Sequence, residues 1–216
     1  MTNTSLLILG AGGHAKVVAE TAIVSGLASN IAFLDDRFSQ SLLTSPLLGW
    51  PVIGDLDCCS HSSTKSAFSM AVVAIGHAPT RLYWLQKLLS CGYEIPSLTH
   101  PSAWVSPSAS IGPGSVIFSH VSVQAHADIK SGAILNTGCS VDHDVLLADG
   151  VHICPGARLA GQVNVGARSW LGIGSSVVEQ VCIGTDVTVG AGATVIGDLP
   201  DGVTAVGVPA KPLLSH

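Results

Sequence analysis

Residues 109–141 decide the fold, and they read ASIGPGSVIFSHVSVQAHADIKSGAILNTGCSV. Within this stretch a valine, isoleucine or leucine stands at every sixth position: Ile111, Ile117, Val123, Ile129, Leu135 and Val141. The same spacing runs without interruption from Val105 to Val195, and the residue four places after each member is small or β-branched in nearly every case. This period fits neither an α-helix nor a simple strand. It predicts a hexapeptide β-helix, in which each hexapeptide forms one short side of a coil.

The stacking of such coils gives each repeated position its role. The branched residue points inward, the small residue fits the turn, and neighbouring coils bury a continuous core that no single coil could bury alone. Three sides close a coil of about 18 residues. Because the register holds from residue 105 to residue 199, we expect no inserted loop. The period does not fix the handedness of the coil.

The first hundred residues follow a different pattern, in which strands and helices alternate. The apolar runs and the helical spacing of leucines predict strands at 5–9, 31–34 and 71–75 and helices at 13–26 and 79–91. Strand–helix–strand order predicts a small, Rossmann-like parallel sheet with right-handed crossovers. Between the second and third strands we expect mostly loop, with a short strand and turn at GWPVIGD, residues 49–55.

Two domains are therefore expected, an α/β domain over residues 1–100 and a β-helix with a C-terminal tail over residues 101–216. The formal net charge of −5 argues against nucleic acid as a partner, because binding to a phosphate backbone needs a basic face. No apolar run reaches the roughly 18 residues of a membrane span. The N-terminus lacks the pattern of a secretory signal, which predicts a cytoplasmic protein.

The six cysteines form no C-x-x-C motif and match no zinc-ligand spacing. We interpret them as reduced thiols, buried or partly buried, as is usual in cytoplasmic proteins. No metal site is expected.

A glycine-rich turn follows the first predicted strand. Gly10, Gly12 and Ala15 stand in the pattern G-x-G-x-x-A at the start of a helix, and an acidic pair follows about 20 residues later. Taken alone this is a fingerprint of NAD binding, but the α/β half has room for little more than one mononucleotide unit. A pyrophosphate of any origin binds such a turn, so a nucleotide sugar fits better. Gly76, after the third strand, permits close approach of this ligand.

Several motifs together resemble the bacterial nucleotide-aminosugar acetyltransferases, which belong to the left-handed β-helix, hexapeptide-repeat superfamily. This family includes N-acetyltransferases of the UDP-bacillosamine pathway, GDP-perosamine N-acetyltransferases and sialic acid O-acetyltransferases. The likeness covers nearly the whole chain. The motifs are GAGGHA at 10–15, FLDD at 33–36, AIGHAPTR at 74–81, HPSAWVSPSA at 100–109, NTGCSVDHD at 136–144 and GVPAK at 207–211.

The resemblance implies a triangular, left-handed β-helix, an acetyl-CoA donor, a homotrimer with active sites between subunits, and an N-terminal domain that holds the nucleotide sugar. It implies that His143 is the general base and that Asp144, where many relatives carry glutamate, raises the basicity of His143. His152 is implied to contact the donor near its thioester. The residues implied to bind the nucleotide sugar are Gly12, Gly13, His14, Asp35 and Asp36.

The neighbours of His143 support this role on physical grounds. His143 stands two positions past the inward Val141, so its side chain should point out of the coil. Asp142 and Asp144 flank it, and a carboxylate that accepts from one ring nitrogen fixes the tautomer and raises the basicity of the other. We predict that His143 takes the proton of the attacking amine and that Asp144 stabilises the imidazolium.

Other side chains have expected roles in the transfer. Asn136, seven residues before His143, is expected near the same edge of the coil, where it positions the acetyl group or the amine; a turn-stabilising asparagine is the alternative. The thioester oxygen gains charge and needs a donor, which a backbone N–H or His152 can supply. Cys139 and Cys154 are not expected to carry the acyl group, because direct attack needs no covalent intermediate.

Coenzyme A is long and needs a groove along the stacked coils. Gly161 lies one coil above His143, and its missing side chain is expected to leave room for the pantetheine arm. The residues of later coils expected to line the groove are Gly172, Ile173, Gly190 and Ala191. Lys211 is expected to meet the nucleotide phosphates of coenzyme A, with an ordinary tail lysine as the alternative.

The spacing of the two key histidines carries a further prediction. Residues 143 and 152 are half a coil apart, and one side of a coil spans roughly 20 Å, so the two imidazoles of one chain should lie on opposite sides of the prism. If both serve one site, they come from different subunits.

We therefore predict an acetyl-CoA-dependent N-acetyltransferase that acts on a UDP-linked 4-amino-4,6-dideoxy sugar of the bacillosamine type in bacterial glycan biosynthesis. GDP-perosamine N-acetylation and sialic acid O-acetylation are the alternatives within the family. A solenoid scaffold or nucleotide-sensing module is the alternative outside enzymes, and an NAD oxidoreductase lacks a recognisable hydride-accepting site. Residues 37–66 are expected to hold the determinants of the nucleotide base and of the sugar's stereochemistry.

Overall fold

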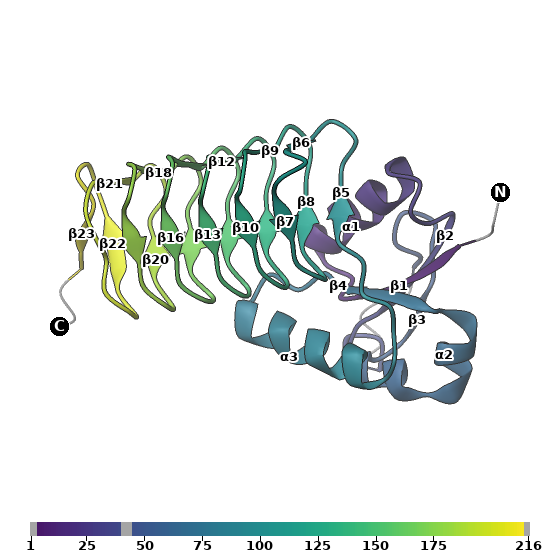
Figure 1. Cartoon of the computed structure of the whole chain (residues 1–216). Coiled ribbons are helices and arrows are strands. Elements are labelled where there is room, and N and C mark those ends of the chain that lie inside the picture. The colour runs from purple at the N-terminus through teal and green to yellow at the C-terminus, as the bar shows by residue number, and fades with distance from the viewer. Residues whose placement is uncertain (1–3, 40–44, 214–216) are drawn as a thin grey trace. The chain divides into compact units, whose positions relative to one another are not determined.

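The structure is a computed structural model that describes residues 4–39 and 45–213 and divides into two compact units (Figure 1). Unit 1 comprises Met1–Thr99 and unit 2 comprises His100–His216, so the division lies one residue before the boundary expected from the sequence. Of the segment expected to hold the base determinants, residues 40–44 lie outside the described residues.

A four-stranded parallel sheet forms the centre of unit 1, in the order β3-β2-β1-β4. Its strands are β1 (Ser5–Leu9), β2 (Asn30–Leu34), β3 (Val52–Gly54) and β4 (Met70–Val73). In β1 the aliphatic run from Leu6 to Leu9 is fully buried, as expected for a central parallel strand covered on both faces. The predicted strands are confirmed with ends shifted by one or two residues, and β3 lies within the short strand predicted at 49–55.

The remaining elements of unit 1 are α1 (Gly13–Val24), η1 (Leu56–Ser60), α2 (Ser62–Ala67), α3 (Ala78–Ser90) and β5 (Leu98–Thr99). Both predicted helices are confirmed, although α1 ends early because Gly26 adopts a left-handed backbone with φ of 74°. The short helices η1 and α2 were not predicted. Only Thr64 is buried in α2, so no apolar period marks it. Among the described residues, no helix is long and apolar enough to cross a membrane.

Unit 2 is a left-handed parallel β-helix whose short strands stack into three sheets, called faces 1, 2 and 3 (Figure 1). Face 1 contains β6 (Trp104–Val105), β9 (Ser122–Val123), β12 (Ser140–Val141), β15 (Arg158–Leu159), β18 (Ser176–Val177) and β21 (Thr194–Val195). Face 2 contains β7 (Ser110–Ile111), β10 (Asp128–Ile129), β13 (Leu146–Leu147), β16 (Asn164–Val165) and β19 (Cys182–Ile183). Face 3 contains β8 (Val116–Ile117), β11 (Ile134–Leu135), β14 (His152–Ile153), β17 (Trp170–Leu171), β20 (Thr188–Val189), β22 (Thr204–Val206) and β23 (Lys211–Pro212).

The core of unit 2 confirms the inward register. From Ile117 to Val195 every branched residue of the six-residue series is at most 3% exposed, and Val105 and Ile111 are partly buried at the first coil. The small residues at the turn positions are buried as well; Ala133, Cys139 and Val145 are each at most 1% exposed. Stacked residues on one face lie 18 residues apart, as the contacts between coils show.

The corners of the coils share a left-handed backbone that the sequence analysis did not anticipate. Every sixth residue from Gly114 to Gly192 has a positive φ. Half of these corners are glycines, and the others are His120, His126, Asp144, Gln162, Arg168, Gln180 and Asp186. Because this backbone is unfavourable for most side chains, each non-glycine corner carries a conformational cost. Neighbouring coils offset part of it, as in the stacked Gln162 and Gln180, whose amide groups lie 2.8 Å apart.

The last coil departs from the register expected up to residue 199. Leu199 forms a bridge with Ile183, 16 residues before it rather than 18, so the expectation of an unbroken register is wrong beyond Val195. The backbone of Leu199 continues face 2 in this shifted register: its N–H donates to the carbonyl of Cys182 at 3.0 Å, and its carbonyl accepts from the N–H of Gly184 at 2.8 Å. Two side chains add to this pairing: Asp198 accepts from the N–H of Cys182 at 2.7 Å, and Asp201 accepts from the N–H of Thr185 at 2.7 Å.

Candidate active site

His143 lies at the corner between faces 1 and 2, directly after β12, and its side chain is 56% exposed. The neighbouring corner residue Asp144 has a φ of 58°, and its Oδ2 lies 2.8 Å from His143 Nδ1. Asp142 accepts a hydrogen bond from the backbone N–H of His143 at 2.7 Å, which holds the turn. The outward direction predicted for His143 is confirmed.

The electrostatics of this corner suit a base. A carboxylate can only accept, so the ring proton of neutral His143 lies on Nδ1 and leaves Nε2 as the proton acceptor. The hydrogen bond that His143 donates to Asp144 raises the pKa of His143 above its ordinary value, and the charges of Asp142 and Asp144 act in the same direction. Nε2 therefore binds a proton more strongly than a plain surface histidine does.

Gly161 lies against the imidazole ring of His143. A Cβ atom at position 161 would approach Cε1 and Nε2 of His143 to 2.5 Å, a distance that real side chains do not tolerate. The missing side chain was expected to leave room for pantetheine, but the space is taken by the His143 ring itself. Gly161 is thus part of the surroundings that fix the ring.

A second group of polar and aromatic residues lies on face 3 and at its corner with face 1. Asn136 Nδ2 lies 3.4 Å from His152 Nε2, and the ring of His152 meets the ring of Trp170 edge to face, with centroids 6.3 Å apart. The expectation that Asn136 lies near the edge of His143 is wrong. Seven residues carry the chain from one corner of the coil to the next, so Asn136 belongs to the edge of His152.

The other residues expected at the donor follow the same edge through the later coils. Gly172 and Gly190 occupy the position of Asn136 two and three coils further on, and Ile173 and Ala191 are exposed beside them. Val206 lies against Gly190, since a Cβ there would meet Val206 Cγ1 at 2.8 Å.

Lys211 lies at the far end of this row of residues. It is exposed in β23 and stands opposite Val206 in the antiparallel pair of β22 and β23. We call the row of Asn136, His152, Trp170, Ile173, Ala191 and Lys211 the His152 edge.

Within one chain, His143 and His152 occupy different sides of the β-helix. His143 follows a face 1 strand at the corner with face 2, whereas His152 is the outward residue of β14 on face 3. In a three-sided coil, face 3 lies opposite the corner of faces 1 and 2. The structure therefore assembles two separate groups in unit 2 and does not bring the two histidines of one chain together.

In unit 1 the glycine-rich turn leads into the N-terminus of α1. Gly10 has a φ of 101°, and a Cβ there would meet the carbonyl oxygen of Ala74 at 2.8 Å, so only glycine fits. Gly12 precedes α1 as its N-cap without a side-chain hydrogen bond, and a Cβ at Gly12 or Gly13 would have no neighbour within 4 Å. The N–H groups at the start of α1 are available to phosphate oxygens.

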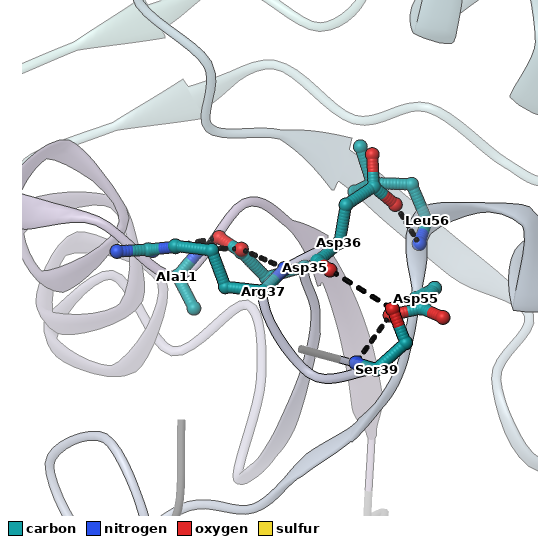
Figure 2. A network of polar contacts seen from close by, with 7 residues as sticks. All are labelled: Ala11, Asp35, Asp36, Arg37, Ser39, Asp55 and Leu56. Carbon is teal, nitrogen blue, oxygen red and sulfur yellow. Dashed lines mark hydrogen bonds and ion pairs between the residues drawn. The ribbon is translucent and has the colours of Figure 1, made fainter. Parts of the chain in front are cut away.

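The acidic pair after β2 is engaged with the protein itself (Figure 2). Asp35 Oδ2 accepts from the N–H of Ala11 at 2.8 Å, and the guanidinium of Arg37 donates to both oxygens of Asp35 at 2.8 Å. The hydrogen bond from Arg37 is the main cause that lowers the pKa of Asp35 to about 2. Asp36 accepts from the N–H of Leu56 at 3.0 Å. These carboxylates hold the glycine-rich turn and the start of η1 in place.

His14 and Arg81 lie near each other, and of the two only Arg81 carries a positive charge at neutral pH. Burial, with the charge of Arg81 as a second cause, lowers the pKa of His14 to about 4, so His14 is neutral at pH 7. Arg81 is 1% exposed and donates from Nη1 to the carbonyls of Ile75 at 2.9 Å and Gly76 at 2.7 Å. Arg81 is the last residue of the AIGHAPTR motif, and no role was predicted for it from the sequence. Its burial, which is rare for an arginine, marks it as a candidate functional residue.

The other groups considered in the sequence for chemistry are the cysteines and the side chains that can ligate a metal. Burial raises the pKa of Cys139 and Cys154 to about 12, so neither thiol forms a nucleophilic thiolate readily. Within the described ranges, no three histidine, cysteine, aspartate or glutamate side chains gather closely enough to hold a metal ion.

Comparisons with known proteins cover nearly the whole chain. The family described as PglD N-terminal domain matches residues 5–88. The acetyltransferase domain of PglB from Neisseria gonorrhoeae is similar with 44% identity and a TM-score of 0.92, over 98% of this chain and 100% of that chain. The same domain has also been solved in complex with acetyl coenzyme A.

A second solved relative is a histidine-to-alanine mutant of GDP-perosamine N-acetyl transferase from Caulobacter crescentus, in complex with CoA and GDP-perosamine. It is 39% identical, with a TM-score of 0.90, over 98% of this chain and 97% of that chain. A serine acetyltransferase from Helicobacter pylori strain J99 is 32% identical over 109 residues, and the chain spans 58% of its length.

Proposed function

Because the chain belongs to the bacterial nucleotide-aminosugar acetyltransferase family, we propose that it transfers the acetyl group of acetyl-CoA to the amino group of a nucleotide-linked sugar. One observation carries the proposal: the 2.8 Å contact between His143 Nδ1 and Asp144 Oδ2, which leaves Nε2 of an exposed imidazole as a strengthened base. A structural solenoid has no need of this arrangement at a corner position that glycine fills in half of the turns.

The proposed chemistry is direct acyl transfer. The neutral sugar amine attacks the thioester carbonyl, a C–N bond forms, and His143 Nε2 takes the proton that the nitrogen loses. The C–S bond then breaks, and the protonated His143 can return the proton to the departing CoA thiolate. Asp144 stabilises the imidazolium between these two steps. No acyl-enzyme intermediate is required, which agrees with the unreactive Cys139 and Cys154.

The His152 edge is the proposed binding surface for acetyl-CoA. His152 and Asn136 meet the acetyl end, Ile173 and Ala191 flank the pantetheine arm, and Lys211 meets a phosphate of the nucleotide. The row from His152 in β14 to Lys211 in β23 crosses four strand spacings, or roughly 19 Å. This extended course along one edge is what a long, thin ligand needs.

The glycine-rich turn of unit 1 is the proposed binding surface for the nucleotide of the acceptor. Its N–H groups receive the pyrophosphate, and neutral His14 can contact a phosphate or the sugar. Asp35 and Asp36 shape this surface through Ala11 and Leu56, in addition to any contact with the base or ribose.

We propose further that the protein works as a homotrimer, in which His143 of one subunit and His152 of its neighbour face one donor. The placement of the two histidines on different sides of unit 2 supports this arrangement. For the acceptor we propose a UDP-linked 4-amino-4,6-dideoxy sugar of the bacillosamine type, which serves bacterial glycan biosynthesis. GDP-perosamine is the second candidate, because the similar Caulobacter enzyme holds that sugar.

A thiol-release assay tests the proposal. The protein is incubated with acetyl-CoA and one acceptor in each reaction, and free CoA thiol is measured. The acceptors are a UDP-linked 4-amino-4,6-dideoxy sugar, GDP-perosamine and sialic acid. We expect release with a nucleotide aminosugar and a loss of about a hundredfold or more in His143→Ala.

The panel also separates the alternatives. Release with sialic acid alone would indicate O-acetylation, and release with GDP-perosamine alone would replace the UDP-linked acceptor. Binding of nucleotide sugars without any thiol release would indicate a sensing or scaffold module and overturn the enzymatic proposal.

A further inference from the structure

Trp170 stands next to His152 on face 3 and has no role in the chemistry described so far. Strands β14 and β17 are neighbours on this face, and Trp170 in β17 stands directly opposite His152 in β14. The two rings meet edge to face with an interplanar angle of 87°. In contrast to its neighbour Leu171, which is fully buried in the core, Trp170 is 36% exposed.

The core of the coil does not require a tryptophan at this position. The outward residues of the same stack are Val116, Ile134, His152, Trp170 and Thr188. These differ in size and polarity, so the fold accepts many side chains here. A large aromatic ring that remains partly exposed beside a single histidine therefore points to a role toward that histidine.

Asn136 adds an orientation to this contact. Its Oδ1 accepts from the N–H of Thr137 at 2.9 Å, which fixes the amide so that Nδ2 faces the ring of His152. Nδ2 is only a donor, so Nε2 of His152 at 3.4 Å acts as the acceptor, and the proton of the neutral ring lies on Nδ1. The contact with Asn136 therefore favours the Nδ1–H tautomer of His152.

We propose that Trp170 is a positioning residue, which together with Asn136 fixes the ring plane and the Nδ1–H tautomer of His152 so that the ring presents one N–H to the acyl donor. The inference rests on the proposed function, in which His152 meets the acetyl end of acetyl-CoA. A thioester oxygen that gains negative charge is stabilised best by a donor that is already oriented, because no reorganisation is needed during the reaction.

The first test measures the free protein and does not depend on activity. Histidines are labelled with ¹⁵N, the signals of His152 are identified by their loss in His152→Gln, and the ring tautomer is read from the nitrogen shifts above neutral pH. We expect the Nδ1–H tautomer in the parent protein and in Trp170→Phe, which keeps an aromatic edge-to-face partner. In Trp170→Ala the ring of His152 loses its aromatic neighbour and can turn away from Asn136, so we expect a mixture of both tautomers.

Trp104→Ala is the matched control, because Trp104 is an outward tryptophan on face 1 and is 59% exposed. It should leave the His152 signals unchanged. If Trp170→Ala also leaves the tautomer unchanged, Trp170 does not position His152 and the inference is overturned. Circular dichroism of each variant shows whether the β-helix remains folded, and Trp170→Phe carries the test if the alanine variant does not fold.

The second test is kinetic. The energy of an edge-to-face aromatic contact corresponds to a factor of about three to ten in a rate constant. We therefore expect kcat/KM for acetyl-CoA to fall by that factor in Trp170→Ala. The loss should appear mainly in kcat, because the oriented N–H matters most in the transition state, and Trp170→Phe should recover most of it. An equal loss in both variants, or a change in KM alone, would contradict positioning.

The two proposals fail in different ways. If the parent protein transfers no acetyl group, the proposed function fails while the tautomer measurement still reports on Trp170. If the parent protein is active and the tautomer does not respond to Trp170, only the inference fails.

Discussion

The behaviour of His143 depends on two neighbours in different directions. Asp144 is adjacent in the chain and reaches back to Nδ1 because its corner has a left-handed backbone. Gly161 belongs to the next coil and lies against the opposite side of the ring, where any side chain would collide with Nε2. The first neighbour sets the basicity of the ring and the second sets its position.

Replacing Asp144 by asparagine tests the first of these effects. His143 acts as a base only when neutral, so activity falls as the pH drops below its raised pKa. In Asp144→Asn the pKa of His143 returns toward its ordinary value, so the acid limb of the kcat/KM profile should move to lower pH. The plateau should fall by about tenfold, because the base is weaker.

Asp186→Asn is the matched control, since Asp186 is also an aspartate at a left-handed corner, with φ of 57°, and is paired with Arg168. Its pH profile should match that of the parent protein. An acid limb that stays in place in Asp144→Asn would show that Asp144 does not set the pKa of the base.

Replacing Gly161 by alanine tests the second effect. The added Cβ would lie 2.5 Å from two ring atoms of His143, so the ring must move, and kcat should fall by about tenfold or more. The melting temperature should change little, because His143 is exposed and can turn away. Gly197→Ala is the control, since a Cβ at Gly197 has no neighbour within 4 Å. Equal activity in both variants would show that Gly161 does not position the ring.

At the scale of elements, the hexapeptide assigns opposite environments to adjacent residues. Each short strand presents one side chain to the core and the next to the outside, and the left-handed corner turns the chain into the following strand. The strands are only two or three residues long, so no single strand is stable alone. Stability arises from the stack, in which each coil covers the core of the previous one.

The two leucines of β13 test this assignment directly. Leu147 is fully buried and Leu146 is 36% exposed in the same strand. Leu147→Ala should lower the free energy of unfolding by about 2–5 kcal/mol, because it leaves a cavity in the stacked core. Leu146→Ala should change it by less than about 0.5 kcal/mol. Urea denaturation followed by circular dichroism measures both, and similar losses would contradict the inward register.

At the scale of the whole molecule, the chain consists of two units with different architectures, an α/β unit and a β-helix. Unit 1 presents a helix N-terminus without a side-chain cap, and unit 2 presents His143 at one corner and the His152 edge on another side. The separation of His143 from His152 within unit 2 is the structural basis for the proposed site between subunits.

Mixed assembly of two inactive variants tests that site. In co-expressed His143→Ala and His152→Ala chains, every mixed trimer contains one site with both histidines intact. Random assembly should therefore restore about a quarter of the parent activity, as expected for sites shared between neighbours in a ring. The controls are the two variants assembled separately, which should stay inactive. No recovery from the mixture would show that both histidines act within one chain.

The sequence by itself determined the architecture of unit 2 and the alternation of elements in unit 1. A period of six residues leaves one solution in which every branched residue reaches a common core, so the inward series could be predicted residue by residue. The direction of His143 followed from its distance to Val141. The flanking aspartates were visible as a pattern, because neighbours in the chain are also neighbours at a corner.

Only the tertiary structure decided which residues meet across coils and how the corners turn. Asn136 joins His152 rather than His143, Trp170 joins the same edge, and Gly161 receives the ring of His143. These contacts join residues 16 to 18 positions apart, and side-chain direction and ring orientation select among them. The register change at Leu199, which pairs with Ile183 across 16 positions, is likewise visible only in the stacked coils, because the apolar series continues in the sequence up to residue 199.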